Sequence, residues 1–73
     1  MIFKDKSVHI NKVGGMYMIS LINQRTLKHI CKLYGIRLID PQIRGYRCLA
    51  LNPDDIHLFI SAFIENGYEV IFL

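Results

Sequence analysis

The side chains of this 73-residue chain that could act in catalysis or metal binding are six acids, three histidines and two cysteines. Asp54 and Asp55 are the adjacent carboxylate pair among them, a type that can hold Mg²⁺ or share acid–base work. Neighbouring helical residues do not face each other, however, and carboxylates in a first helical turn stabilise its positive end. The start of a helix therefore explains this pair without chemistry.

The histidines and cysteines show no spacing typical of an active site. His9, His29 and His57 belong to three different predicted elements, so none has a ligand partner at i+4 or a cysteine to activate. Cys31 and Cys48 lack a CxxC or Cys/His pattern and have apolar neighbours, which is typical of reduced core thiols. No phosphate-cradling glycine loop or serine nucleophile motif is present. We expect a protein that is not an enzyme and that uses no cofactor and no metal.

Length and composition predict a single domain over residues 1–73, because a chain this short builds only one core. The hydrophobic fraction of 52% is sufficient for that core. No apolar run approaches the roughly 20 residues that a membrane span needs, and the first residues do not resemble a signal peptide. We expect a cytoplasmic protein that does not contact membranes.

The positive charge is concentrated in the first two thirds of the chain. The net charge is +3, and eight of the nine Lys and Arg residues precede Arg47, which is the ninth. Four of the six acids follow it. A basic first part is compatible with contact to phosphate groups.

The first half of the sequence predicts two strands and a helix. Residues 7–21 alternate around Gly14-Gly15 and read as two extended segments, whose pairing as a hairpin the sequence leaves open. The next apolar residues recur at i, i+3, i+4 and i+7, the spacing of an amphipathic helix that ends at Gly35: Leu27, Ile30, Cys31 and Tyr34. Its other face carries Arg25, Lys28 and Lys32, which either face solvent or grip phosphates or an acidic partner.

The second half predicts two short strands, a helix and a final strand. Segments 36–39 and 44–51 are suited to pair through a turn at 41–45. Asn52 caps the helix, Pro53 takes its first position and Asn66-Gly67 closes it. Its predicted buried stripe is Ile56, Phe59, Ile60, Phe63 and Ile64. Residues 68–73 form a nearly continuous apolar run, which predicts a strand with both faces covered.

The resulting order is ββαββαβ. Strands interleaved with one-sided helices predict an α/β (α+β) fold, in which two main helices pack on a mixed sheet.

Three segments in this order resemble the N-terminal mismatch-recognition domain (domain I) of MutS repair proteins. Val13–Met18 resembles that family's G-x-F-Y-E motif, and Leu33–Leu38 is similar to its helix ending in Leu-Gly-Ile-x-Leu. The tail resembles its closing loop, helix and Gly-[YE]-x-Val-Ala-Ile strand through Ala50–Asp54, Phe59-Ile60, Phe63-Ile64 and Gly67–Phe72. The resemblance implies a MutS domain I-like fold and a stand-alone, non-enzymatic module that binds duplex or distorted DNA.

The motif residues that read a mispaired base in that family differ here. Met16 stands where the family has the Phe that wedges into the minor groove, and Met18 where it has the Glu that hydrogen-bonds the base. A methionine can still act as an apolar wedge, whereas losing the carboxylate removes the group that reads the base. The predicted nucleic-acid-binding residues are Lys12, Gly14, Gly15, Met16, Tyr17, Met18, Arg44 and Arg47.

Two other interpretations stay open at this point. Met16 and Tyr17 are equally typical of ordinary strand residues, with the cations on a solvated surface. Alternatively, the chain is a protein-interaction adaptor or inhibitor of phage or plasmid type that acts on a repair or replication component. An exposed apolar patch of Phe3, Met16 and Met18 would then contact the partner.

Overall fold

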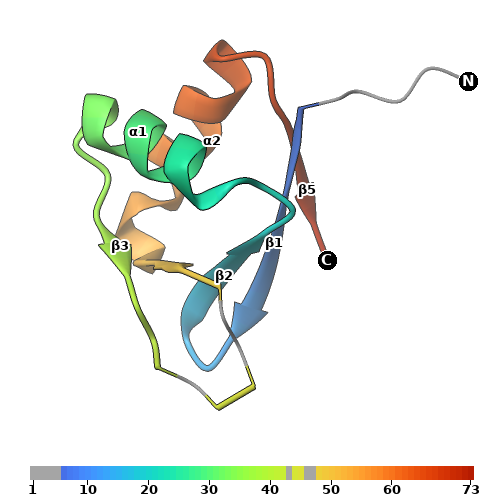
Figure 1. The fold of residues 1–73 in the computed structure, drawn as a ribbon, viewed down its shortest axis with the longest axis vertical. Helices are drawn as coiled ribbons and strands as arrows, with labels where there is room; N and C mark the ends of the chain where they lie inside the picture. Colours follow the sequence, from blue (N-terminus) through green and yellow to red (C-terminus); the bar gives the residue numbers. More distant parts are fainter. Residues whose placement is uncertain (1–5, 43, 46–47) are drawn as a thin grey trace, which may run out of the picture.

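A computed structural model describes residues 6–42, 44–45 and 48–73, which form a mixed five-stranded sheet and two helices (Figure 1). The elements are β1 (Ser7–Val13), β2 (Met16–Ser20), α1 (Gln24–Tyr34), β3 (Leu38–Ile39), β4 (Ala50–Leu51), a 3₁₀ turn (Pro53–Asp55), α2 (Ile56–Glu65) and β5 (Glu69–Phe72). Their spatial order in the sheet is β3-β4-β2-β1-β5. The predicted element order and the mixed α+β sheet are confirmed.

Strands β1 and β2 pair antiparallel as a hairpin, which answers the question that the sequence left open. Gly14 and Gly15 form its two-residue turn with φ values of 55° and 79°. Left-handed backbone at both turn positions is the conformation that glycine adopts most readily, and it matches the twist of the paired strands. The glycine pair is thereby explained by the turn.

The sheet is mixed because the outer strands join this hairpin in different directions. β5 runs parallel to β1, whereas β4 pairs antiparallel with β2 and with β3. The predicted pairing of the two short segments is confirmed, but each strand has two residues rather than four and eight. Arg44 lies in the turn between them, and Tyr46 and Arg47 lie outside the described residues.

Helix α1 has the C-terminal glycine and the buried stripe that its sequence predicts, together with an N-cap at Asn23 that the sequence pattern did not identify. The Asn23 side chain accepts a hydrogen bond from the Arg25 N–H (2.8 Å), and Gly35 ends the helix with φ 70°. Its buried residues are Leu27, Ile30 and Cys31. The i, i+3, i+4 spacing therefore identified the core-facing side correctly.

Helix α2 departs from its predicted pattern at both ends. Asn52 is the expected cap, since its side chain accepts from the Asp54 N–H (2.9 Å), but Pro53–Asp55 form a 3₁₀ turn before the α-helix starts. Phe59 and Phe63 are fully buried, as predicted. Ile64 was predicted to be buried and is 59% exposed, because it follows Phe63 by about 100° around the helix and leaves the core face.

Both helices cover the same face of the sheet (Figure 1). The core cluster contains Val8, Ile10 and Ile19 from the hairpin and Phe59 and Phe63 from α2. We call this side the helix-side face and the other the open face. Every buried residue in the described ranges is apolar, and no helix in them is long and apolar enough to cross a bilayer.

The position of β5 differs from the prediction. The apolar run 68–73 was expected inside the sheet with both faces covered, but β5 is an edge strand. Phe72 is 54% exposed and Leu73 is 69% exposed. Within the described residues β5 has a neighbouring strand on one side alone, and both helices lie on one face of the sheet, so the prediction of an interior strand covered on both faces is wrong.

Candidate nucleic-acid interface

Two aromatic rings and a lysine meet on the helix-side face, next to the hairpin turn. Lys12 and Tyr17 are direct cross-strand partners, and the Lys12 Nζ lies 5.9 Å from the centre of the Tyr17 ring. The Phe72 ring meets the Tyr17 ring edge-on, with centroids 6.4 Å apart and planes at 81°. We call Lys12, Tyr17 and Phe72 the aromatic–cation cluster.

Strand alternation and register bring these three residues together. Residues 8, 10 and 12 of β1 point to the helix-side face, and register places Tyr17 opposite Lys12 and Phe72 opposite Ile10. Burial ends along β1 between Ile10, which is fully buried, and Lys12, which is exposed. The cluster thus continues the core surface beyond the part that the helices cover.

The two methionines of the predicted DNA-binding motif lie on the open face instead. Met16 pairs with Val13 and Met18 pairs with Asn11 and Ala50, so both point away from Lys12 and Tyr17. Met16 is half-buried and Met18 is only 2% exposed. The expected exposed patch is therefore wrong at Met18, and Phe3 lies outside the described residues.

The other predicted site residues that the structure describes lie outside the aromatic–cation cluster. Gly14 and Gly15 are exposed in the turn that follows Lys12. Arg44 is exposed in the connection between β3 and β4, and Arg47 lies outside the described residues. Among the described members of the predicted set, Lys12 and Tyr17 are the pair for which a cation–ring contact is observed.

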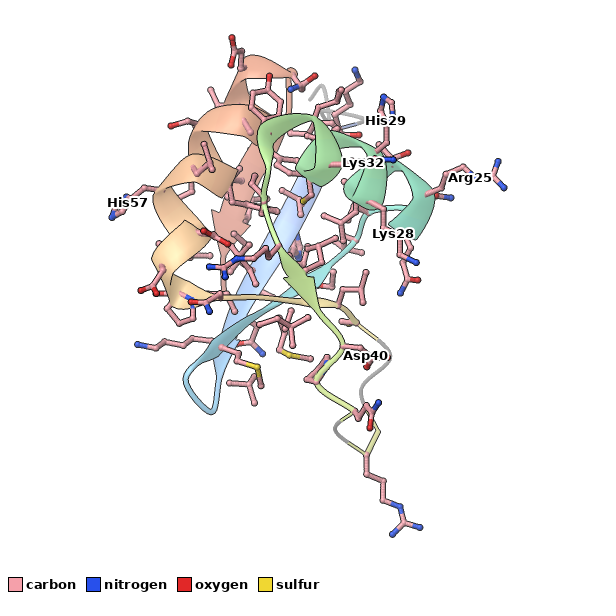
Figure 2. The ribbon with its side chains drawn as sticks, turned by 90° about the vertical axis from the view of Figure 1, so that its left-hand side faces the viewer. Arg25, Lys28, His29, Lys32, Asp40 and His57 are labelled. Atoms are coloured by element: carbon pink, nitrogen blue, oxygen red, sulfur yellow. The ribbon has the colours of Figure 1, made fainter. Side chains whose placement is uncertain are left out.

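Arg25, Lys28 and Lys32 are the cations of α1, and they form a basic surface that is separate from the aromatic–cation cluster. Figure 2 shows Arg25, Lys28, His29 and Lys32 projecting outward from this helix. All four are exposed, and α1 contains no acidic residue. Like charges three or four residues apart on a helix destabilise it slightly, so this surface would favour an anionic neighbour.

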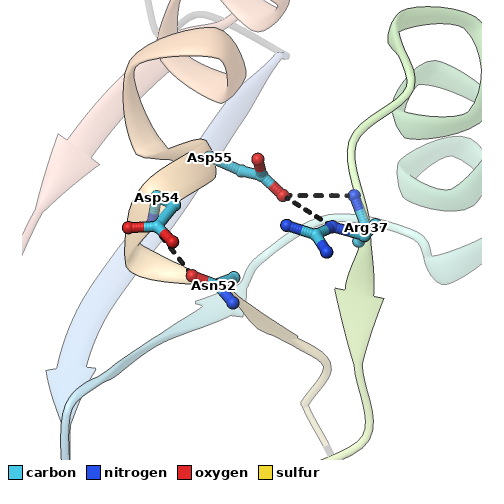
Figure 3. Close-up of polar contacts among 4 residues, drawn as sticks. All are labelled: Arg37, Asn52, Asp54 and Asp55. Carbon is cyan, nitrogen blue, oxygen red and sulfur yellow. Dashed lines mark hydrogen bonds and ion pairs between the residues drawn. The ribbon is translucent and has the colours of Figure 1, made fainter.

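The acidic pair lies in the first turn of the 3₁₀ segment that precedes α2, in keeping with its predicted place at the start of a helix. The Asp55 carboxylate lies 3.6 Å from the Arg37 Nε and 3.5 Å from the Arg37 backbone N (Figure 3). Asp54 is held through its backbone N–H by Asn52. Asp55 therefore ties the start of the α2 segment to the entry of β3, and its carboxylate is engaged by Arg37.

The thiols and imidazoles are dispersed. Cys31 and Cys48 are free, and burial raises the pKa of the Cys31 thiol from 9.0 to about 11, which keeps it protonated at neutral pH. His9 is half-buried in β1, while His29 and His57 are exposed on different helices. The described residues contain no group of three or more potential metal ligands.

Phe72 is the member of the cluster that the sequence did not reveal as a site residue. The prediction placed it within a covered strand, where an aromatic residue is ordinary core. Only the parallel pairing of β5 with β1 places Phe72 next to Tyr17, and this pairing joins residues more than 50 positions apart in the chain. No local pattern carries that information.

Comparison of the chain with protein-family models, with curated proteins and with solved structures finds no match. The resemblance to the mismatch-recognition domain therefore stays a prediction.

Proposed function

We propose that this chain is a non-enzymatic nucleic-acid-binding module that contacts unpaired or unstacked bases through its aromatic–cation cluster. The observation that carries the proposal is the exposed Phe72 ring beside Tyr17, with the Lys12 ammonium group 5.9 Å from the centre of the Tyr17 ring. Aromatic rings stack on bases of any sequence, and each such contact contributes about 1–3 kcal/mol. A lysine beside them supplies the phosphate contact.

A second cation–ring pair, formed by the residues that precede β1 and β5, shows why the hairpin end is favoured as the binding site. The Lys6 Nζ lies 5.6 Å from the centre of the Tyr68 ring, but that ring packs edge-on against the buried Phe63 at 5.4 Å. Tyr68 is thus engaged by the core beneath α2. Phe72 has no comparable cover, since more than half of it is exposed.

Distorted duplex DNA is the preferred form of nucleic acid in this proposal, because bases must leave the stack to reach a ring. The resemblance to MutS domain I supports this preference, and it adds Met16 on the open face as the wedge residue. A wedge can insert only at a weakly stacked or distorted base step, because unstacking a step costs about a few kcal/mol. Met16 lies beside the turn and is half-buried, so its side chain is partly accessible.

Fluorescence anisotropy with labelled oligonucleotides tests the proposal. A single strand, a matched duplex and a duplex with one mismatch are titrated at low and at moderate salt. We expect the single strand and the mismatched duplex to bind more tightly than the matched duplex, and all binding to weaken as salt rises. Tyr17→Leu keeps an apolar residue against the core and removes the ring, and should weaken binding about 5- to 100-fold.

Tyr68→Leu is the matched control, because it makes the same change in the other cation–ring pair. It should leave binding near the wild-type value. Circular dichroism establishes that both variants keep the fold. Absence of binding to all three oligonucleotides at low salt would refute the proposal, and so would equal losses in the two variants. If a Met16→Ala variant binds the mismatched duplex as tightly as wild type, Met16 does not act as a wedge.

A further inference from the structure

We propose that β5 is a self-association surface, through which two copies of this chain join their sheets edge to edge around a two-fold axis. The inference rests on the geometry of the β5 edge and of α2. It shares Phe72 with the proposed nucleic-acid site, but it does not require nucleic-acid binding.

The backbone of β5 presents hydrogen-bonding groups on its outer side. The N–H group of Glu69 donates to the carbonyl of Lys6, which immediately precedes β1, and the N–H group of Leu73 donates to the Ile10 carbonyl of β1, at 2.9 Å each. Successive backbone groups of a strand point to alternate sides, so the N–H and C=O groups of Val70 and Phe72 point away from β1. Within the described ranges, no strand pairs with this outer side.

Apart from Glu69 at its start, β5 lacks, among the residues that the structure describes, the features that usually prevent strands from pairing between molecules. Proteins protect an edge with lysine, proline, a bulge or a covering segment. Val70–Leu73 contain neither a charged residue nor a proline, and their pairing with β1 is regular. Phe72 and Leu73 are both more than half exposed. An apolar edge of this kind favours a partner strand over water.

Helix α2 extends the apolar edge above the sheet. Around the helix, the buried Phe59, Ala62 and Phe63 separate two flanks. Glu65 lies on one flank, where its carboxylate accepts a hydrogen bond from the Tyr34 hydroxyl of α1 (3.3 Å). Ile60 and Ile64 lie on the opposite flank, away from α1 and on the same stripe as His57. Figure 2 shows His57 pointing away from α1.

A second copy of the chain is the occupant that this surface fits best, because the edge is complementary to itself. Antiparallel pairing of two β5 strands around Ile71 places Val70 of each copy opposite Phe72 of the other, so that four outward N–H groups meet four outward C=O groups. Ile71 of one copy meets Ile71 of the other on the open face. No like charges are opposed, since Glu69 lies across from Leu73.

The same arrangement gives the dimer a continuous sheet with both helix layers on one side. The two aromatic–cation clusters then lie on the same surface, because a two-fold axis perpendicular to a sheet keeps equivalent faces together. The contact is small by the standard of stable complexes, so we expect dissociation in the range of about 10–100 μM rather than an obligate dimer.

Sedimentation velocity over a concentration series tests the dimer. The mass should rise from 8.5 kDa towards twice that value as concentration increases. Phe72→Lys should raise the dissociation constant at least about tenfold, because it places two like charges close to the two-fold axis. Ile64→Lys should also raise the dissociation constant, because it puts a charge on the apolar flank of α2 that faces away from α1. Leu33→Lys is the matched control, since Leu33 is 67% exposed on α1 and should leave association unchanged.

Amide hydrogen exchange adds a readout that does not depend on any variant. The N–H groups of Val70 and Phe72 should exchange more slowly at high than at low concentration, while the exposed residues of α1 show no change. A mass of 8.5 kDa at every concentration would overturn the dimer, as would an equal effect of Leu33→Lys or concentration-independent exchange at Val70 and Phe72. Ile64 is not part of the aromatic–cation cluster, so loss of dimer in Ile64→Lys with intact single-strand binding would separate the two proposals.

Discussion

Two aromatic pairs on the helix-side face have opposite relations to solvent. Phe59 and Phe63 stack on each other beneath α2, with ring centroids 4.2 Å apart and planes at 22°, and both are fully buried. Tyr17 and Phe72 meet edge-on at 6.4 Å, and Phe72 is more than half exposed. Aromatic side chains thus stabilise the fold beneath α2, whereas at the other end of the same surface they remain accessible to a ligand. Substitutions in each pair test how sharply these roles divide.

The largest effect is expected in the buried pair. Phe63→Ala removes a ring that contacts both Phe59 and Tyr68, and should lower the free energy of unfolding by about 3–5 kcal/mol. Such a loss is a large fraction of the stability of a small domain. Urea denaturation followed by circular dichroism measures it. A loss below about 1 kcal/mol would contradict the view that this pair anchors the sheet to α2.

The second prediction concerns Cys31, which belongs to the same buried region. Burial raises its pKa from 9.0 to about 11, so the folded state holds its proton more tightly than the unfolded state. The contribution of the protonated Cys31 thiol to the free energy of unfolding is therefore fully present below pH 9. It is lost as pH rises through 11, and the total loss is about 2–3 kcal/mol. Urea denaturation at several pH values should show this decline in wild type and a smaller one in Cys31→Ala.

The tyrosines also titrate in this pH range, which is why the comparison uses the difference between the two proteins. An equal alkaline decline in wild type and in Cys31→Ala would show that the thiol does not contribute. As an independent check, Cys31 should react with a thiol reagent much more slowly than the half-buried Cys48.

The buried region was largely predictable from the sequence, whereas the exposed cluster was not. Leu27, Ile30 and Cys31 repeat at helical spacing, and Gly35 stops the helix, so local patterns are sufficient there. Helical periodicity wrongly predicted Ile64 to be buried, because this apolar residue lies next to the buried stripe of α2 but outside the core. Helical periodicity locates the centre of a buried face better than its borders.

Register and strand order explain the remaining failures. Lys12 and Tyr17 could be named from the sequence, but their pairing depends on the hairpin register, which alternation alone left open. The same register turns Met16 and Met18 to the open face. The edge position of β5, and with it the exposure of Phe72, depends on contacts between distant segments, which a local hydrophobic pattern does not encode.

The third prediction tests the exposed pair against the buried one. Phe72→Ala should lower the free energy of unfolding by no more than about 1 kcal/mol, because most of the ring already faces solvent. It should nevertheless weaken single-strand binding clearly, since a stacking ring is lost. Binding is measured at a protein concentration below the dimer range. A stability loss as large as that of Phe63→Ala would mean that the two aromatic pairs do not differ in role.

The smallest effect on stability is expected at Lys12. Lys12→Gln removes an exposed cation over the Tyr17 ring, a contact that contributes about 0.5–1 kcal/mol at such sites. Its effect on binding differs in kind from that of Tyr17→Leu or Phe72→Ala, because a phosphate contact releases counterions and a stacking contact does not. The slope of log affinity against log salt for a single strand should therefore become shallower by about 0.7.

Lys32→Gln removes a cation from the separate surface of α1, and it should leave the slope unchanged if the aromatic–cation cluster alone contacts the strand. Equal changes in slope for the two variants would instead extend the interface across α1, and an unchanged slope in Lys12→Gln would take Lys12 out of the phosphate contact.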